Sequence, residues 1–488
     1  MGATGTPCNL TAGPALTKRG ATRERRKLTG YNCEMTDLAD LLACPRCDKT
    51  PLEFKPRGVH CKACKTDFPL LAGMPWMFAE PDASLAEWRG RLHTALAKLA
   101  RESESLAAEL GSDSLLTETR SRLERYRAAI DEHRGRLAEL LAPVGLETRA
   151  GSYESYLALR TRLPVDQGLN TYYANVHRDW CWGDEENAAS LAEIRSALEG
   201  EDSLGRVLVL GAGAGRLAYD LHARLDCTDV TALDFNPLLM LVARVVTAGE
   251  ALEMYEFPLA PLRDTDDAVL RTLAAPEAAG ETFKLVLGDA LRPPFTTGAF
   301  DTVVTPWLID IVTDDLGSFA PRVASLLTDG GRWINFGSLA FATPRRAGRY
   351  GPAEVAAIVA DSGFAPPVTR DAAIPYMCSP ASRHGRREIV HTFVATRTGK
   401  APAPERYRAL PDWLVTGKSP VPASESFRTQ AVSTQIYAFV MSLIDGRRTI
   451  EDMAAVLEQR RLMPRDEAVP AIRGFLMRMY DDANRQSL

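Results

Sequence analysis

The feature that most constrains this chain is an apolar run that leads directly into a loop of alternating glycines. Val207-Leu208-Val209-Leu210 has the composition of a buried strand, and Gly211-Ala212-Gly213-Ala214-Gly215 follows it before a helical stretch begins near Arg216. Glycines at alternate positions let the backbone turn sharply and let a ligand approach it closely. From Arg206 to about Arg397, further short apolar runs alternate with helical stretches. This alternation predicts the α/β class, with a Rossmann-like, doubly wound parallel sheet.

Two carboxylates follow later strands of this predicted sheet. Asp234 ends the strand Val230 to Leu233, and Asp289 ends the strand Leu285 to Leu287. The first can accept hydrogen bonds from both ribose hydroxyls of a nucleoside, and the second can accept the adenine amino group. A dinucleotide site would want a third glycine where the chain has Arg216. The glycine spacing instead suits S-adenosylmethionine, which has no phosphate, and the expected cofactor residues are Gly211, Gly213, Gly215, Asp234, Asp289 and Ala290.

Four cysteines near the N-terminus have the spacing of a metal site. Cys44 and Cys47 form one Cys-x-x-Cys pair, and Cys61 and Cys64 form a second. Each pair can form a tight turn that aims two thiolates at one point, with the intervening residues running out and back as a hairpin. Because the protein would fill all four ligand positions, the predicted Zn²⁺ is structural rather than catalytic. The alternative is four reduced cysteines without a metal.

Charge and hydropathy exclude some classes of protein. The 488 residues carry a formal net charge of −5, which argues against a surface built to bind nucleic acid. No apolar run is long enough to cross a bilayer, and the N-terminus lacks the apolar core of a secretory signal. These observations predict a soluble, cytoplasmic protein with no membrane partner.

The predicted domain order follows from shifts in composition and periodicity. Apolar residues at mixed three-and-four spacing, such as Trp88, Leu92 and Leu99, occur in two stretches broken by Gly111 and predict two helices folded as a hairpin. Either this hairpin packs within the chain or it mediates dimerisation. Proline-rich composition predicts a linker before a small helical unit, in which Thr449 is the expected helix cap. The expected segments are a disordered stretch at 1–34, a zinc ribbon at 35–80, the hairpin at 81–145, the methyltransferase domain at 165–398, the linker at 399–424 and the C-terminal unit at 425–488.

An indole and a carboxylate lie between the fourth predicted strand and the next helix, in Thr305-Pro306-Trp307-Leu308-Ile309-Asp310. They suit an amine or imidazole nitrogen that must be neutral and aligned with the methyl–sulfur axis. Asp310 is the candidate catalytic residue because it could orient the nucleophile or take its proton. Its alternative role is a helix N-cap.

Two segments resemble known families. Residues 42–47, 61–64 and 68–75 resemble a small zinc-ribbon family whose members activate partner methyltransferases, which implies a module for protein contacts or stabilisation, here within its own chain. Arg178-Asp179-Trp180, the segment 209–218, Ile309-Asp310 and the segment 330–339 together resemble the carnosine N-methyltransferase family.

The second resemblance implies roles for particular residues. Arg178 would reach the carboxylate of the cofactor, and Asn175 stands where the family has Gln. Asp234 and Asp289 would bind ribose and adenine, and Asp310 would face the substrate.

The chain also departs from that family. Phe341-Ala342 stands where the family has an aromatic residue followed by a substrate-binding histidine, and the family's late tyrosine cluster is replaced around Arg383-His384-Gly385-Arg386-Arg387. This basic cluster suggests a substrate that carries a carboxylate or phosphate, and a solvated surface loop is an equally good interpretation. His384 could replace the missing imidazole, and Trp307 is the other candidate substrate residue.

We therefore expect an S-adenosylmethionine-dependent methyltransferase that N-methylates a small amine, imidazole or peptide-like substrate. One alternative is a non-catalytic or regulatory scaffold with a cofactor-binding fold. Another is a protein or peptide methyltransferase recruited by the C-terminal unit, which resembles winged-helix modules that hold peptide substrates. Protein contacts are expected through the zinc ribbon and the C-terminal unit.

Overall fold

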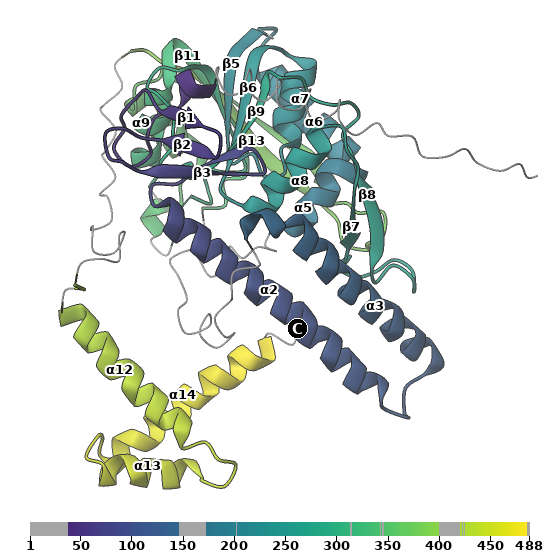
Figure 1. Ribbon diagram of the computed structural model, residues 1–488, viewed down its shortest axis with the longest axis vertical. Coiled ribbons are helices and arrows are strands. Elements are labelled where there is room, and N and C mark those ends of the chain that lie inside the picture. Colours follow the sequence, from purple (N-terminus) through teal and green to yellow (C-terminus); the bar gives the residue numbers. More distant parts are fainter. Residues whose placement is uncertain are drawn as a thin grey trace, which may run out of the picture. The chain divides into compact units, whose positions relative to one another are not determined.

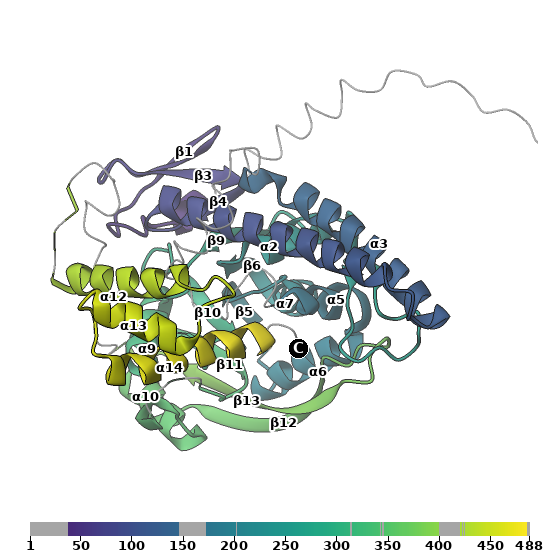
Figure 2. The same ribbon diagram turned by 90° about the horizontal axis from the view of Figure 1, so that it is seen from below.

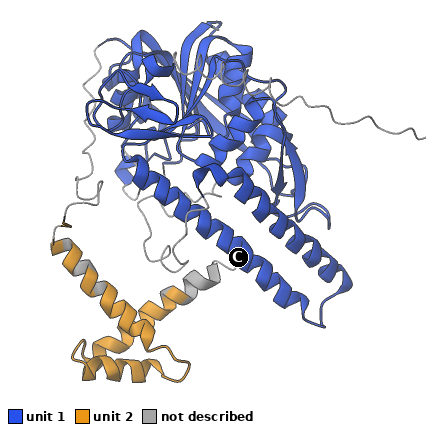
Figure 3. Cartoon of the chain, viewed as in Figure 1, with its two compact units in different colours: residues 1–409 blue, residues 410–488 orange. Residues whose placement is uncertain are grey.

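The computed structural model describes two compact units, residues 1–409 and residues 410–488, which are coloured blue and orange in Figure 3. The expected disordered stretch at 1–34 and most of the expected linker at 399–424 lie outside the described residues. The described residues are 38–145, 172–201, 203–312, 315–341, 343, 346–399, 420–421, 423 and 425–485.

A mixed sheet forms the centre of the first unit (Figure 1). Seven of its strands follow the order β9-β6-β5-β10-β11-β13-β12. The first five of these run parallel, and β13 is antiparallel to both of its neighbours. This topology confirms the predicted Rossmann-like methyltransferase fold. The strands are β5 (Ser203–Leu210), β6 (Asp226–Asp234), β9 (Phe283–Gly288), β10 (Phe300–Pro306), β11 (Leu327–Gly337), β12 (Val368–Tyr376) and β13 (Arg386–Thr396).

The segment that carries the four cysteines adds strands to the same sheet. It forms β1 (Glu53–Lys55), β2 (Gly58–His60), β3 (Asp67–Leu71) and β4 (Met74–Met77), each antiparallel to the next. Strand β4 also pairs in parallel with β9, through Trp76 opposite Leu287 and Met77 opposite Gly288. The cysteine-bearing segment therefore extends the sheet beside β9, the strand that directly precedes Asp289.

Alternate residues of β5 face two different cores. Val207 and Val209 pack with one set of helices, whereas Leu208 and Leu210 pack with another, as the two-residue period of a strand requires. The first core includes helices α6 to α8 and the second includes α9 and α10 (Figures 1 and 2). The sheet is thus buried on both faces. The helices are α5 (Tyr173–His177), the π-helical turn η2 (Arg178–Trp182), α6 (Asp184–Ala197), α7 (Arg216–Arg224), α8 (Pro237–Thr247), α9 (Leu316–Leu326) and α10 (Pro352–Asp361).

The predicted helical hairpin is present as α2 (Pro81–Leu110) and α3 (Thr117–Leu140), which lie side by side in Figures 1 and 2. Trp88, Leu92 and Leu137 are buried in the core that covers α8. The base of the hairpin therefore packs within the chain, as one of the two alternatives predicts. Beside it lies a two-stranded antiparallel sheet of β7 (Leu252–Glu256) and β8 (Val269–Leu273).

The second unit holds α12 (Glu425–Ser442), α13 (Ile450–Gln459) and α14 (Arg465–Arg485). The Thr449 side chain accepts a hydrogen bond from the Asp452 N–H at 3.1 Å, so Thr449 caps α13 as predicted. No strand that could form a wing lies within 425–485. Across the described ranges of the chain, no helix combines the length and the apolar content needed to cross a membrane.

Candidate active site

The glycine loop between β5 and α7 has a backbone that demands glycine. Gly211, Gly213 and Gly215 have φ angles of 71°, 59° and 85°, in the left-handed region. A Cβ built on Gly211 would lie 2.8 Å from Leu308 Cδ1, whereas one built on Gly213 would meet no atom within 4 Å. Gly213 therefore leaves open space beside the end of the sheet, where a ligand can approach the backbone.

Asp234, at the end of β6, is held over this loop by backbone donors. Its Oδ2 accepts from the Gly213 N–H and its Oδ1 accepts from the Asn236 N–H, both at 2.8 Å. Burial raises the pKa of Asp234 to about 6, and the backbone N–H groups of Asn236 and Gly213 act in the opposite direction. Each carboxylate oxygen can accept a further hydrogen bond. The arrangement can therefore hold a diol such as the two hydroxyls of a ribose.

Asp289 and Ala290 follow β9, the strand next to β6. Because neighbouring parallel strands have their carboxyl ends at the same edge of a sheet, Asp289 and Asp234 both lie at that edge. Asp289 Oδ1 accepts from the Leu291 N–H at 2.8 Å, and both Asp289 and Ala290 are half-buried. The structure thus brings the glycine loop and the two expected carboxylates to one edge.

Arg178 lies in η2 and is engaged by two acidic residues. Its Nε donates to Asp179 Oδ1 at 2.7 Å, and its Nη1 lies 3.3 Å from Glu186 Oε1. Burial alone would lower the pKa of Arg178, but these carboxylates raise it above its usual value. The guanidinium is therefore a cation held in a fixed position by two carboxylates. Asn175 is half-buried one turn earlier, and its N–H bonds the Tyr172 carbonyl at 3.0 Å.

Asp310 is buried in the turn after β10. Its Oδ2 accepts from the Ser338 hydroxyl at 2.6 Å and from the Ala340 N–H at 3.1 Å. Burial raises the pKa of Asp310, while these hydrogen bonds lower it. The N-cap of the next helix, α9, is Asp315 and not Asp310, so the alternative role of Asp310 as an N-cap is wrong. Asp310 is a buried carboxylate oriented by the turn after β11.

Trp307 has an unusual backbone for a bulky residue. Its φ is 50°, and its N–H donates to the Phe336 carbonyl at 2.7 Å. A Cβ on Gly337, whose φ is 148°, would lie only 2.8 Å from Trp307 Cα. Such strained conformations persist only where neighbouring structure imposes them, and they cluster at functional sites. The absence of a side chain at Gly337 therefore lets Trp307 adopt this conformation beside Asp310.

Two tyrosines that sequence reasoning missed complete this side of the site. The Tyr376 ring, at the end of β12, lies 4.9 Å from the Trp307 ring, and the Arg386 guanidinium lies 4.7 Å from the Tyr376 ring centre. Burial, and after it the charges of Asp234, Tyr376 and Asp310, raise the pKa of Tyr172. An aromatic residue at a strand end is the one signal that could have indicated Tyr376.

The basic cluster is largely engaged by its own fold. Arg383 donates to the Leu262 carbonyl at 2.9 Å, Arg387 donates to the Ala373 carbonyl at 2.8 Å, and Arg386 pairs with Glu388 at 2.7 Å. His384 is exposed, and its backbone N–H donates to the Ser382 hydroxyl at 3.0 Å. Arg383 and His384 thus lie in an exposed loop, whereas Arg386 and Arg387 begin strand β13. Ala342, the other departure from the family, lies outside the described residues.

The four cysteines converge on one point within the cysteine-bearing segment. Their Sγ atoms all lie within 4.8 Å of one another, with 3.5 Å between Cys44 and Cys64 and 3.6 Å between Cys47 and Cys61. Zn–S bonds of about 2.3 Å in a tetrahedron place sulfurs about 3.8 Å apart, so the residues fit a tetrahedral metal ion.

The two cysteine turns also share one backbone pattern. The Asp48 N–H donates to the Cys44 carbonyl at 2.8 Å, and the Lys65 N–H donates to the Cys61 carbonyl at 2.9 Å. Asp48 and Lys65, each directly after the second cysteine of its pair, have φ angles of 59° and 60°. The repeated turn aims each pair of thiolates at the common centre.

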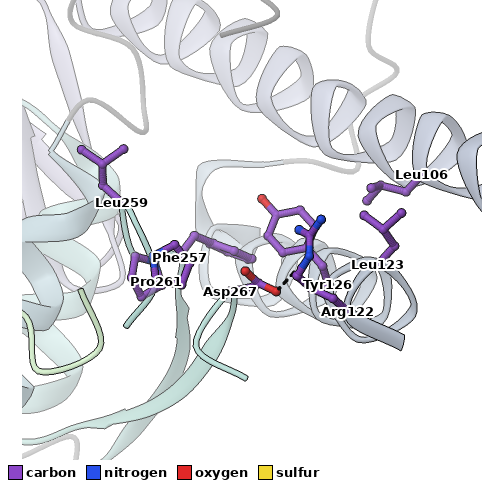
Figure 4. A pocket seen from close by; sticks show the side chains of 9 residues that line it. Leu106, Arg122, Leu123, Tyr126, Phe257, Leu259, Pro261 and Asp267 are labelled. Carbon is purple, nitrogen blue, oxygen red and sulfur yellow. Dashed lines mark ion pairs between the residues drawn. The ribbon is translucent and has the colours of Figure 1, made fainter. Parts of the chain in front are cut away.

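A separate pocket of about 370 Å³ lies between the helical hairpin and the loop after β7 (Figure 4). Leu106 and Leu123 form one side and Phe257 and Leu259 the other, and Arg122 pairs with Asp267 at 4.0 Å. Neither the glycine loop nor Asp310 lines this pocket. The chemistry described above therefore belongs to the edge of the main sheet and not to this hollow.

Comparison with known proteins agrees with the geometry. Residues 167–354 match the family described as carnosine N-methyltransferase. Carnosine N-methyltransferase of Schizosaccharomyces pombe is 24% identical over 283 residues, which cover 52% of this chain and 74% of that protein.

Two solved structures of methyltransferases are similar to part of this chain. Phosphoethanolamine N-methyltransferase 2 of Haemonchus contortus, in complex with S-adenosyl-L-methionine, has a TM-score of 0.31 at 14% identity and covers 51% of this chain and 60% of that one. Magnesium protoporphyrin IX methyltransferase of Synechocystis PCC 6803 has a TM-score of 0.29 at 15% identity, with 59% and 99% covered. The family match and the curated relative, rather than these structures, support the assignment of the matched region. Its catalytic region is an S-adenosylmethionine-dependent methyltransferase homologous to carnosine N-methyltransferases.

Proposed function

We propose that this enzyme methylates a nitrogen of a small amine, imidazole or peptide-like substrate, with Asp234 on the cofactor side of the site and Asp310 on the acceptor side. The observation that carries this proposal is the placement of both carboxylates at the carboxyl ends of parallel strands, with open space over Gly213. Ligands of open α/β sheets bind at that edge. The curated relative is named for an N-methyltransferase, which supports nitrogen as the acceptor atom.

The proposed cofactor contacts follow from the hydrogen-bonding groups present. Asp234 accepts the ribose hydroxyls, Asp289 with Ala290 contacts the adenine, and Gly211, Gly213 and Gly215 let the nucleoside lie against the backbone. Arg178 and Asn175 face the amino-acid end. S-adenosylmethionine supplies an activated methyl group on a sulfonium.

On the acceptor side, Asp310 and Trp307 align the nucleophile. The nitrogen lone pair forms the new N–CH₃ bond while the S–CH₃ bond breaks and its electron pair goes to sulfur. Asp310 takes or orients the proton that the nitrogen loses, and its raised pKa favours that transfer. Trp307 and Tyr376 form an aromatic wall against which a flat or cationic acceptor can pack.

A direct test uses isotopically labelled methyl donor with carnosine, other histidine-containing dipeptides and simple primary amines. We expect labelled N-methyl product from at least one of these classes with the full chain. The proposal is wrong if none is methylated while label appears on an oxygen or sulfur acceptor in cell extract. Because the scaffold alternative predicts no turnover at all, the same experiment separates it from the enzyme.

We also propose that the four cysteines hold one structural zinc ion. The sulfur separations and the paired turns support this assignment. Elemental analysis of the native protein is expected to find about one zinc ion per chain, lost when Cys44 and Cys47 are replaced by Ser. Native protein that contains no zinc would contradict this assignment.

The contribution of the second unit stays a prediction. Phe427, Tyr437 and Ile444 are exposed apolar residues near or on α12. If this unit recruits a protein or peptide substrate, removal of 399–488 abolishes turnover on that substrate and leaves cofactor affinity intact. Unchanged turnover on a small amine after this removal favours the small-molecule assignment.

A further inference from the structure

The loop that follows Asp289 is attached to the cysteine-bearing segment by main-chain hydrogen bonds. The Ala43 N–H donates to the Pro294 carbonyl at 2.9 Å, and the Thr296 N–H donates to the Leu41 carbonyl at 2.8 Å. Between these bonds, Leu42 and Phe295 form a β-bridge and are both buried. The loop at 289–296 is therefore built on a segment that lies far away in the sequence.

One side chain of this loop reaches into a cysteine turn. The Arg292 Nη2 donates to the Arg46 carbonyl at 2.9 Å, and Arg46 lies between Cys44 and Cys47. The backbone N–H of Arg292 donates to the Asp289 carbonyl at 3.0 Å. A short series of bonds thus connects the Cys44–Cys47 turn with Asp289.

The other side of Asp289 is held by β4. Met77 lies opposite Gly288, and a Cβ on Gly288 would come within 3.2 Å of the Met77 carbonyl oxygen and 3.0 Å of Leu233 Cδ1. The strand end that precedes Asp289 is therefore closely packed. The position of Asp289 therefore depends on the cysteine-bearing segment on both sides, and the Arg292 bond reaches the Cys44–Cys47 turn directly.

We propose that Arg292 is a positioning residue that couples the metal-bound Cys44–Cys47 turn to Asp289 and so sets the affinity for the adenosine part of the cofactor. This inference rests on the proposed roles of Asp289 and of the four cysteines. Metal binding would fix the turn and hence the direction of the Arg46 carbonyl, because the ion holds together four thiolates that otherwise repel one another. When the turn relaxes, Arg292 loses its fixed acceptor and the loop at 289–296 loosens. The acceptor side, which is built from β10 to β12, is not involved.

The test measures binding of S-adenosylhomocysteine to the full chain by calorimetry. We expect Arg292→Gln to weaken binding about tenfold, because a hydrogen bond from a charged donor is lost. Zinc content and KM for the acceptor should stay unchanged, and Arg292→Lys should restore part of the affinity. The matched control is Arg195→Gln, since Arg195 also donates to a backbone carbonyl, that of Arg224 at 2.7 Å, away from the site. Equal affinity of Arg292→Gln and wild type overturns the inference.

A second measurement tests the coupling itself. Chelation of the metal should weaken wild-type binding to a similar degree but add little to the loss in Arg292→Gln, because both changes break one connection. Losses that add fully contradict the coupling. If the chelated protein unfolds, hydrogen exchange on the metal-bound protein replaces this step. Exchange within 289–296 should then be faster in Arg292→Gln than in Arg195→Gln, and equal protection overturns the inference.

Failure of the inference differs from failure of the proposed function. If Asp234→Ala and Asp289→Asn leave binding unchanged, the cofactor site itself is wrongly assigned. If both weaken binding but Arg292→Gln does not, the site stands and the coupling through Arg292 is wrong.

Discussion

The proposed cofactor side, around Asp234, and the proposed acceptor side, around Asp310, are built differently. Asp234 accepts hydrogen bonds from the backbone N–H groups of Gly213, in the loop after β5, and of Asn236, in the turn after β6. Asp310 is held by Ser338 and Ala340 from the turn after another strand. The first arrangement depends mainly on backbone shape, whereas the second depends on side chains and on a distant turn. We therefore expect substitutions on the proposed acceptor side to leave cofactor binding unchanged.

The largest expected effect concerns the acceptor side. Asp310→Asn should lower kcat about 1000-fold, because the proton acceptor is lost, and should leave S-adenosylhomocysteine affinity unchanged. Steady-state kinetics and calorimetry measure the two quantities. Asp315→Asn is the matched control, since Asn also caps helices well. A joint loss of kcat and cofactor affinity would show that the two sides are not independent.

Asp234→Ala should have the next largest effect, on the cofactor side. We expect cofactor affinity to fall about 100-fold, because two hydrogen bonds to a charged group are lost. The KM for the acceptor should change little. Thermal unfolding of Asp234→Asn serves as the control. Asn lacks the buried charge but can accept from only one of the two backbone N–H groups, so this variant should fold with a stability within about 2 kcal/mol of wild type. A folded Asp234→Ala protein with wild-type affinity would show that Asp234 does not bind the cofactor.

The pKa of Asp234 predicts a pH dependence of cofactor binding. Burial raises this pKa to about 6, and donated ribose hydroxyls favour the ionised form. Affinity should therefore fall as the pH drops through 6, by about tenfold between pH 7 and pH 5. For the ligand-free protein the sign is opposite. The folded state holds this proton more tightly than the unfolded state, so this group makes stability fall as the pH rises from about 4 to 6. Calorimetry with Asp234→Asn, which should lose the dependence, checks the assignment.

Tyr376→Leu tests the aromatic contact on the proposed acceptor side. Loss of the aromatic wall next to Trp307 should raise the KM for the acceptor about tenfold, in line with the value of a ring contact to a cation or flat ring. Tyr376→Phe keeps the ring and should stay within about threefold of wild type if packing is what matters. An equal loss in both variants would assign the effect to the hydroxyl instead.

The smallest expected difference separates backbone strain from ligand contact in the glycine loop. Gly213→Ala and Gly330→Ala both place a Cβ at a positive φ with no atom within 4 Å, so each should cost about 1 kcal/mol of stability. Only Gly213→Ala should weaken cofactor binding, because its Cβ enters the space proposed for the nucleoside. Similar affinities in the two variants would contradict that placement.

Residue spacing alone was enough to predict the alternation of strands and helices along the chain, the glycine loop with its two carboxylates, and the four-cysteine pattern. These features depend on local spacing: a two-residue period, a strand end, or a tight turn with ligands two residues apart. The structure bears out the fold and the convergence of the cysteines.

Three contacts could be found only from the folded structure. Strand β4 pairs with β9, the Tyr376 ring packs on the Trp307 ring, and the Arg292 side chain bonds the Arg46 carbonyl. The tertiary structure also decided that Asp310 binds Ser338 rather than capping a helix, since Asp315 takes that place. Each of these contacts joins segments that are distant in the chain, and periodicity carries no information about which distant segments meet. Hydrogen-bonding capacity and apolar faces can be read from the residues, but their partners are chosen by packing of the whole sheet.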